Sequence, residues 1–199
     1  FAVGVFLGRL ALAGVARAAD RPVVGFKFML GHNAAFRETV LYADDYKKIA
    51  VWRENVLAAY SSQKIARATG QGSVRRPDKV KEATVDFDPD EFADFMSQRD
   101  RQYRMLSDAL GGDSDERVLF VEYTSLATVE GVQRIIRFIG ADPDQPIEVP
   151  TVKRNSNDIV ARFNNPSDVM RFLEAQSLTH WATEDAKGMQ RHEFDPAAR

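Results

Sequence analysis

Arg53 and Ser61 are the two residues whose types and spacing point most directly to chemistry. An apolar, strand-like run ends at Arg53, and a helix-forming run begins at once and carries Ser61 about two turns along. Ligands bind outside the carboxyl ends of strands in open α/β sheets, and a guanidinium offers two parallel donors that suit a phosphate. We therefore predict that Arg53 and the Ser61 hydroxyl converge on one anion. In the alternative interpretation, Arg53 pairs with a carboxylate at the sheet edge and Ser61 is a small helix residue.

A second group of hydrogen-bond donors stands at Lys153 and Arg154, beside Asn155 and Ser156. Two cationic side chains next to an amide and a hydroxyl, on a non-helical segment, form a compact set suited to a dense anion. The alternative is an ordinary solvated pair of loop cations.

Lys27 and His32 form the third candidate group. Lys27 interrupts an apolar, strand-like run. Burying a lysine there costs free energy unless its charge is used or reaches solvent. His32 follows that run, and an imidazole can accept a proton near neutral pH. The alternative for His32 is a loop histidine that caps a helix.

Three segments resemble, in the right order, the PAPS-dependent sulfotransferase family in its bacterial type. Arg53, with Asn55 two positions on and Ser61 eight positions on, is similar to the family's 3′-phosphate-binding segment. Residues 118–142 are similar to its strand, loop and helix, although the Tyr-Glu-like pair is reversed here as Glu-Tyr. Residues 151–173 resemble its C-terminal basic loop and the Asn-containing start of the next helix.

The resemblance implies transfer of a sulfuryl group from PAPS (3′-phosphoadenosine 5′-phosphosulfate) to an acceptor hydroxyl or amine, by in-line displacement and without a metal. It implies that Arg53 and Ser61 hold the 3′-phosphate, with help from Lys153 and Arg154. His32 would be the general base, and Lys27 would stabilise charge on the bridging oxygen.

Some relatives use a Glu as the base, and Glu38 is the nearest substitute for His32. The family's Gly/Ser/Thr-rich loop for the 5′-phosphosulfate is absent from this sequence, as is the GxxxxGK[ST] pattern. We therefore expect the domain to be incomplete at its N-terminus. Two other interpretations stay open: a non-catalytic α/β nucleotide-binding or interaction domain, and another nucleotide-phosphate transferase such as a kinase.

The elements that must position these residues alternate between strand and helix. The patterns predict strands over residues 23–30, 47–53 and 117–123, helical segments over 1–19, 33–45, 54–68, 88–110 and 128–139 and from Asn165 onward, and a surface loop over 71–87. This order is typical of an α/β domain with a central parallel sheet flanked by helices, and the resemblance makes it a P-loop-like, three-layer domain. We expect one such domain over residues 1–186 and a loose tail over 187–199.

Composition narrows the classes of partner. The net charge of -2 argues against a nucleic-acid binder that works through a broad basic face. With no Cys and only 3 His, disulfides, thiolate metal sites and Cys nucleophiles are excluded, and a His-rich metal centre is disfavoured. Arg9 and Arg17 interrupt the apolar run over 1–19, which favours a buried helix over a membrane span or a signal peptide. We expect a cytoplasmic protein with a small-molecule or carbohydrate acceptor, and the oligomeric state stays open.

Overall fold

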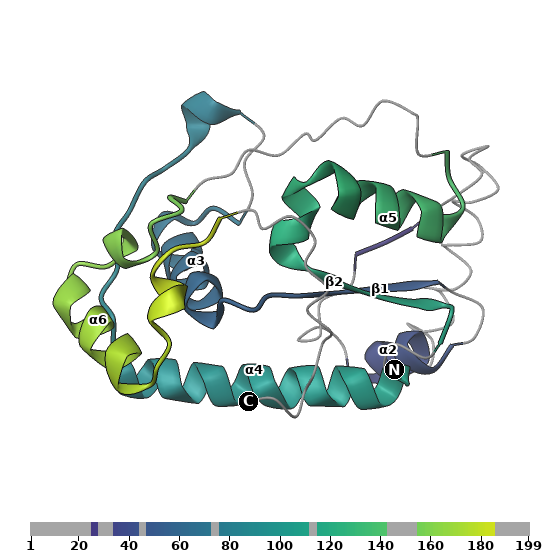
Figure 1. The fold of residues 1–199 in the computed structure, drawn as a ribbon, viewed down its shortest axis with the longest axis horizontal. Helices are drawn as coiled ribbons and strands as arrows, with labels where there is room; N and C mark the ends of the chain where they lie inside the picture. Colours follow the sequence, from purple (N-terminus) through teal and green to yellow (C-terminus); the bar gives the residue numbers. More distant parts are fainter. Residues whose placement is uncertain are drawn as a thin grey trace.

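The computed structural model describes residues 25–27, 34–43, 47–72, 76–111, 115–142 and 155–185. These residues form a mixed α/β structure (Figure 1). In chain order the elements are α2 (Ala34–Tyr42), β1 (Lys48–Trp52), α3 (Val56–Thr69), η1 (Pro77–Lys79), α4 (Pro89–Leu110), β2 (Val118–Glu122), η3 (Tyr123–Ala127), α5 (Val129–Ile139), η4 (Val160–Arg162), α6 (Pro166–Ala175) and η5 (Thr179–Ala182).

The two described strands pair in parallel, so their carboxyl ends meet at one edge of the sheet. One face of this sheet packs against α2 and α4, through a core that includes Ala50, Phe120 and Leu106. Helix α5 contacts β2 and lies on the opposite side of the sheet in Figure 1. Ile49 and Val51 point to that second side and stay exposed. The strand predicted over 47–53 is present as β1, but its burial alternates, so it is buried on one face and not throughout.

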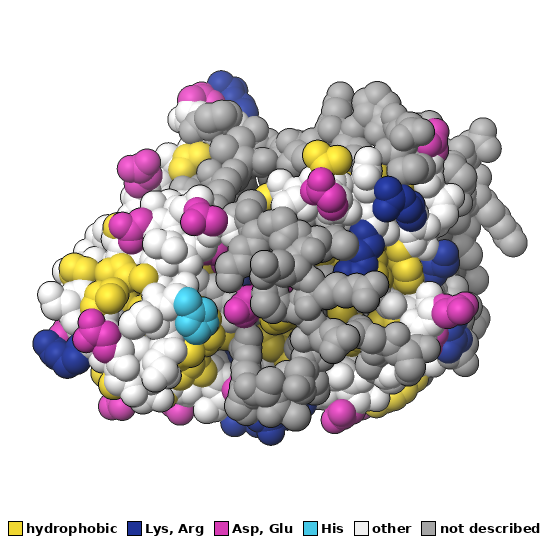
Figure 2. Space-filling model, viewed as in Figure 1, with side chains coloured by type: hydrophobic (Ala, Val, Ile, Leu, Met, Phe, Trp, Pro, Cys, Tyr) yellow, Lys and Arg dark blue, Asp and Glu magenta, His cyan; other side chains and the backbone are white. Residues whose placement is uncertain are grey.

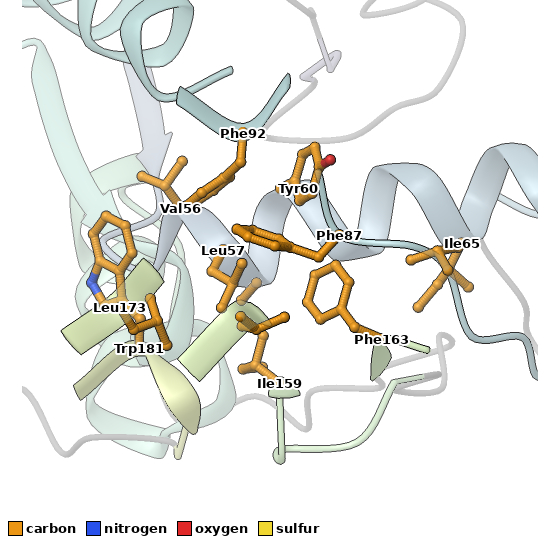
Figure 3. Packing of buried hydrophobic residues seen from close by; sticks show 13 residues of the cluster. Val56, Leu57, Tyr60, Ile65, Phe87, Phe92, Ile159, Phe163, Leu173 and Trp181 are labelled. Atoms are coloured by element: carbon orange, nitrogen blue, oxygen red, sulfur yellow. The ribbon is translucent and has the colours of Figure 1, made fainter. Parts of the chain in front are cut away.

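A second and larger core surrounds α3. Aromatic rings from several segments meet at Tyr60, whose ring contacts Phe87, Phe92, Phe95 and Phe163 (Figure 3). Helix α6 and the short helices η4 and η5 close this core through buried apolar side chains. The junction between β1 and α3 thus lies between the two cores, and it is the place from which Arg53 projects.

Local signals set most of the helix ends. Asp88 caps α4 by accepting hydrogen bonds from the N–H groups of Asp90 and Glu91, and Pro89 occupies the first turn. The reciprocal half of a capping box is not formed, because the Glu91 side chain binds Tyr60 instead. Gly70, which ends α3, has φ of 69°, a left-handed conformation that glycine adopts without strain.

Two predicted segments differ from the structure. Residues 25–27 lie outside any strand and are exposed, so the predicted strand over 23–30 is wrong there; the rest of that range lies outside the described residues. The predicted surface loop over 71–87 is wrong at its end. The side chains of Val85 and Phe87 are buried in the core around α3. The backbone of this segment is held there by hydrogen bonds from Val85 N–H to Arg162 O and from Phe87 N–H to Asn165 Oδ1.

In Figure 2, the hydrophobic side chains of the described residues are visible as several separate patches. Within these residues, no helix has both the length and the apolar character that crossing a bilayer would require. The predicted helix over 1–19 and tail over 187–199 lie outside the described residues.

Candidate anion-binding site

Arg53 stands at the carboxyl end of β1, where the sequence predicted it. Its side chain forms a two-point ion pair with Glu184: Nε donates to Oε1 at 2.7 Å, and Nη2 donates to Oε2. The Tyr123 ring, at the end of β2, packs on the guanidinium with its centroid 4.4 Å from Cζ. The alternative role for Arg53, a carboxylate pair at the sheet edge, is therefore present in this structure. Its role toward a phosphate stays a prediction.

Backbone contacts fix where Arg53 leaves the strand. The N–H of Arg53 donates to the Tyr103 hydroxyl of α4 at 3.1 Å, and the N–H of Glu54 donates to Oε1 of Glu122 at 3.3 Å. Asn55 then caps α3, because its Oδ1 accepts from the Ala58 N–H at 2.9 Å. The strand therefore turns into the helix within three residues, and the turn is bound to both α4 and β2.

Ser61 lies on α3 and is fully buried. Its hydroxyl donates to Ala58 O at 3.2 Å and accepts from Nη1 of Arg162 at 3.0 Å. Ser61 therefore faces a guanidinium, but it is the guanidinium of Arg162 and not that of Arg53. In this structure the Ser61 hydroxyl would act on a ligand only indirectly, through its hydrogen bond with Arg162.

Arg162 is a buried arginine that joins η4 to α3. Besides Ser61, its Nη1 donates to Ala58 O at 3.3 Å and to the Ser62 hydroxyl at 3.4 Å, while Nε donates to Ser156 O at 3.0 Å. Its Nη2 donates to the same Ser156 carbonyl. Asn155 adds a link from this segment, since its Nδ2 donates to the Ser62 hydroxyl at 3.0 Å. The segment that follows Lys153 and Arg154 is thus tied to the first two turns of α3.

The site holds more positive than negative charge. Burial, together with the positive charge of Arg53, lowers the pKa of Arg162 to about 10, while Glu184 opposes the shift. The two guanidinium groups are therefore close enough to repel each other, and Glu184, which binds Arg53 and attracts Arg162, is the one buried acidic residue among the described residues. Arg162 is still protonated at neutral pH, so the two guanidinium groups and the Glu184 carboxylate together carry one net positive charge, while the more exposed carboxylate of Asp158 also attracts Arg162. An anion would relieve this imbalance.

The site is closed in this structure. The side chains of Arg53 and Glu184 are only 14% and 4% exposed. Two surface hollows lie elsewhere: one of about 450 Å³ along α6, lined in part by Met170, and one of about 220 Å³ between α2 and α4, lined in part by Arg37. Neither hollow includes a residue of the site, because the side chains of the site fill it with their own hydrogen bonds.

The remaining predicted residues are not brought to this site by the described structure. His32, Lys153 and Arg154 lie outside the described residues. Lys27 is exposed and lies outside any strand, so its predicted place inside an apolar strand is wrong. Glu38 is exposed on α2. The roles predicted for all five stay predictions.

Two residues of the site were missed from the sequence. Arg162 could have been found, because it stands in the apolar run Ile159–Phe163, where a charged residue needs buried partners. Glu184 had no local signal, since its partner Arg53 lies 131 residues earlier in the chain.

Among the described residues, no group of three or more His, Cys, Asp or Glu side chains is arranged to hold a metal ion. Comparison of the chain with protein-family models, with curated proteins and with solved structures finds no match.

Proposed function

We propose that the protein is a PAPS-dependent sulfotransferase, built on a P-loop-like layered domain, in which Arg53 binds the 3′-phosphate of the nucleotide. The observation that carries the proposal is the pair of neighbouring guanidinium groups, Arg53 and Arg162, with one buried carboxylate, that of Glu184, acting on both. They lie at the carboxyl end of a parallel strand and beside the start of α3, where open α/β sheets bind ligands. The order of the three family-like segments in the sequence is the second support.

The chemistry of the donors also fits a phosphate. A phosphate accepts two parallel hydrogen bonds from one guanidinium, in the same geometry that the Glu184 carboxylate uses with Arg53. The Ser62 hydroxyl and the Asn155 amide lie in the same hydrogen-bond network. In the proposed site Lys153 and Arg154, which directly precede Asn155 in the chain, add positive charge.

In the proposed reaction the acceptor oxygen or nitrogen forms a bond to sulfur, while the bond from sulfur to the bridging phosphate oxygen breaks. PAP (3′-phosphoadenosine 5′-phosphate) leaves with that electron pair. His32 takes the proton of the acceptor, with Glu38 as the alternative base, and Lys27 stabilises the negative charge of the leaving oxygen. Positioning and charge stabilisation supply most of the catalysis, so the step needs no metal.

The test is a comparison of ligands by calorimetry on the full chain. We expect binding of PAP without Mg²⁺ and at least about tenfold weaker binding of ATP, because ATP has no 3′-phosphate. A preference for ATP with Mg²⁺ would favour a kinase, and binding of neither nucleotide would favour an interaction domain.

Variants of Arg53 connect the affinity to the site. Arg53→Lys keeps the charge but loses the fork, so we expect PAP binding to weaken about tenfold or more. The double variant Arg53→Met with Glu184→Gln removes the cation and its partner together, so Glu184 is not left as a buried carboxylate without its guanidinium. Arg99→Lys is the matched control, since Arg99 also packs on an aromatic ring, 5.1 Å from the centroid of Phe95, but lies outside the site. Unchanged PAP affinity in both Arg53 variants would contradict the assignment.

A role for His32 is tested by turnover. His32→Ala should lower kcat by about 100-fold or more while the affinity for PAP stays the same, because a general base acts on the acceptor and not on the nucleotide. Full turnover in this variant would move the role to another group, and Glu38→Gln would be the next variant to measure.

A further inference from the structure

Glu184 holds Arg53 as an anionic ligand would hold it. Both carboxylate oxygens bind one edge of the guanidinium, and the Tyr123 ring covers one of its faces. Within the described part of the chain, Arg53 is the group to which the Glu184 carboxylate is hydrogen-bonded. The residue is therefore an internal substitute for an external anion.

The segment that carries Glu184 is attached by a few backbone contacts. The N–H of Glu184 donates to Asn157 O at 2.9 Å, and Thr183 forms an isolated bridge with Asp158. Asn55 Nδ2 adds a bond to Thr183 O at 3.2 Å. Thr183 and Asp185, the neighbours of Glu184, are exposed. Release of Glu184 requires these contacts and the bond from Asn157 Nδ2 to Asp185 Oδ1 to break, while Trp181, three positions earlier, belongs to the buried core around α3.

We propose that Glu184 is an exchangeable latch: it occupies the anion position on Arg53, and a phosphate group of the nucleotide displaces it. This inference rests on the proposed function, because it assigns a regulation to the same site.

When a phosphate replaces the Glu184 carboxylate, Arg53 keeps the same number of hydrogen bonds. A phosphate replaces the two hydrogen bonds of the carboxylate one for one and brings more negative charge to Arg53 and Arg162. The two anions cannot share one edge of the guanidinium. Because the site is closed by Glu184, only the fraction of molecules with the latch open can bind, and the apparent affinity is reduced by that fraction. Removing the carboxylate should therefore raise the affinity.

Two variants at adjacent positions separate the effect of removing the latch from the effect of removing a negative charge near the site. Glu184→Gln removes the carboxylate that binds Arg53, and we expect it to bind PAP about tenfold more tightly than the wild type. Asp185→Asn removes the same charge from the next residue, an exposed carboxylate whose Oδ1 accepts from Asn157 Nδ2 at 3.2 Å. We expect this control to change the affinity less than about threefold.

Hydrogen exchange of the wild type reports the displacement itself. We expect the amide of Glu184 to exchange faster when PAP is bound, because its bond to Asn157 O is released. The inference is overturned if Glu184→Gln binds PAP no more tightly than the wild type, if Asp185→Asn tightens binding equally, or if PAP slows exchange at Glu184. When the wild type binds PAP, each of these results leaves the proposed function intact. Absence of PAP binding in both the wild type and Glu184→Gln would overturn both proposals.

Discussion

Nη1 of Arg162 lies 3.0 Å from the hydroxyl of Ser61, and this contact joins two segments that are 101 residues apart in the chain. The guanidinium is buried, and it also binds carbonyl oxygens of Ala58 and Ser156. One side chain therefore fixes the place of the segment around Ser156 against the start of α3. The geometry of the candidate site depends on this link.

Arg162→Met should lower the free energy of unfolding by about 2–4 kcal/mol, because it removes the hydrogen bonds by which one buried guanidinium joins Ser61 and Ser62 to the Ser156 carbonyl oxygen. Arg162→Lys should lose part of that amount, since an ammonium cannot reach both segments with a rigid fork. Urea denaturation measures both values. Arg171→Met is the control, because the Arg171 side chain is 76% exposed and its ion pair with Asp168 should contribute less than about 1 kcal/mol. Equal losses of unfolding free energy in Arg162→Met and in Arg171→Met would contradict the role of Arg162.

Local sequence signals were sufficient for much of the fold. Asp88 with Pro89, and the glycines Gly70 and Gly140, set helix ends through contacts within a few residues. The helices predicted over 54–68, 88–110 and 128–139 therefore match α3, α4 and α5 to within two residues at each end. The same signals could not show that Val85 and Phe87 enter the core. Several of their partners lie far along the chain, and the alternation of polar and apolar residues over 84–88 is too short to distinguish a buried segment from a loop.

The candidate site was predicted only in part, for the same physical reason. The end of β1 and the start of α3 are local features, and they led to Arg53 and Ser61. The groups that these residues bind, Glu184 and Arg162, come from the C-terminal part of the chain. A buried charge in an apolar run indicates that a partner must exist, but not which residue it is.

The side chain of Asn55 does more than cap a helix. Its Oδ1 accepts from Ala58 N–H, and its Nδ2 donates to the carbonyl oxygens of Trp181 at 3.0 Å and Thr183 at 3.2 Å. Asn and Asp are about equal at ordinary caps. Here Asn55→Asp would place a carboxylate oxygen against two carbonyl oxygens in a buried site.

We expect Asn55→Asp to lower the free energy of unfolding by about 1–3 kcal/mol. Asp88→Asn, the reverse exchange at the cap of α4, should stay within about 0.5 kcal/mol of the wild type, since Asp88 accepts only from N–H groups of its own helix. Chemical denaturation of the two variants under the same conditions makes the comparison. If the two exchanges had the same effect, the bonds from Asn55 to the η5 region would contribute nothing to stability.

Gly131 marks a close approach between α5 and the turn after β2. A Cβ atom on Gly131 would overlap the carbonyl oxygen of Ser125, which is backbone and cannot rotate away. Gly131→Ala should therefore lower the free energy of unfolding by about 2–4 kcal/mol. Gly72→Ala is the control, because a Cβ there meets nothing within 4 Å, and it should be neutral or stabilising by up to about 1 kcal/mol. Thermal melts of both variants test this, and a Gly131→Ala protein as stable as the wild type would exclude the close approach.

Glu91 joins α4 to α3, because its carboxylate accepts hydrogen bonds from Lys64 Nζ at 2.6 Å and the Tyr60 hydroxyl at 2.9 Å. The hydrogen bond from Lys64 lowers the pKa of Glu91 below its ordinary value of 4.5. A carboxyl whose pKa is lowered by folding stabilises the protein above pH 4.5, and this contribution is lost as the pH falls through the folded pKa.

Glu91→Gln should therefore be less stable than the wild type at pH 7, by about 1 kcal/mol or less because the side chain is half-exposed and solvent screens it. The difference should shrink as the pH falls below 4.5, since protonation of the wild-type carboxyl removes the same charge. Urea denaturation at pH 7, 5 and 3 measures the difference at each pH. Glu116→Gln, at an exposed carboxylate, is the control and should show a smaller difference throughout. The difference in unfolding free energy between Glu91→Gln and the wild type could instead stay constant from pH 7 to pH 3. That result would mean that Glu91 contributes through packing, because packing does not depend on protonation.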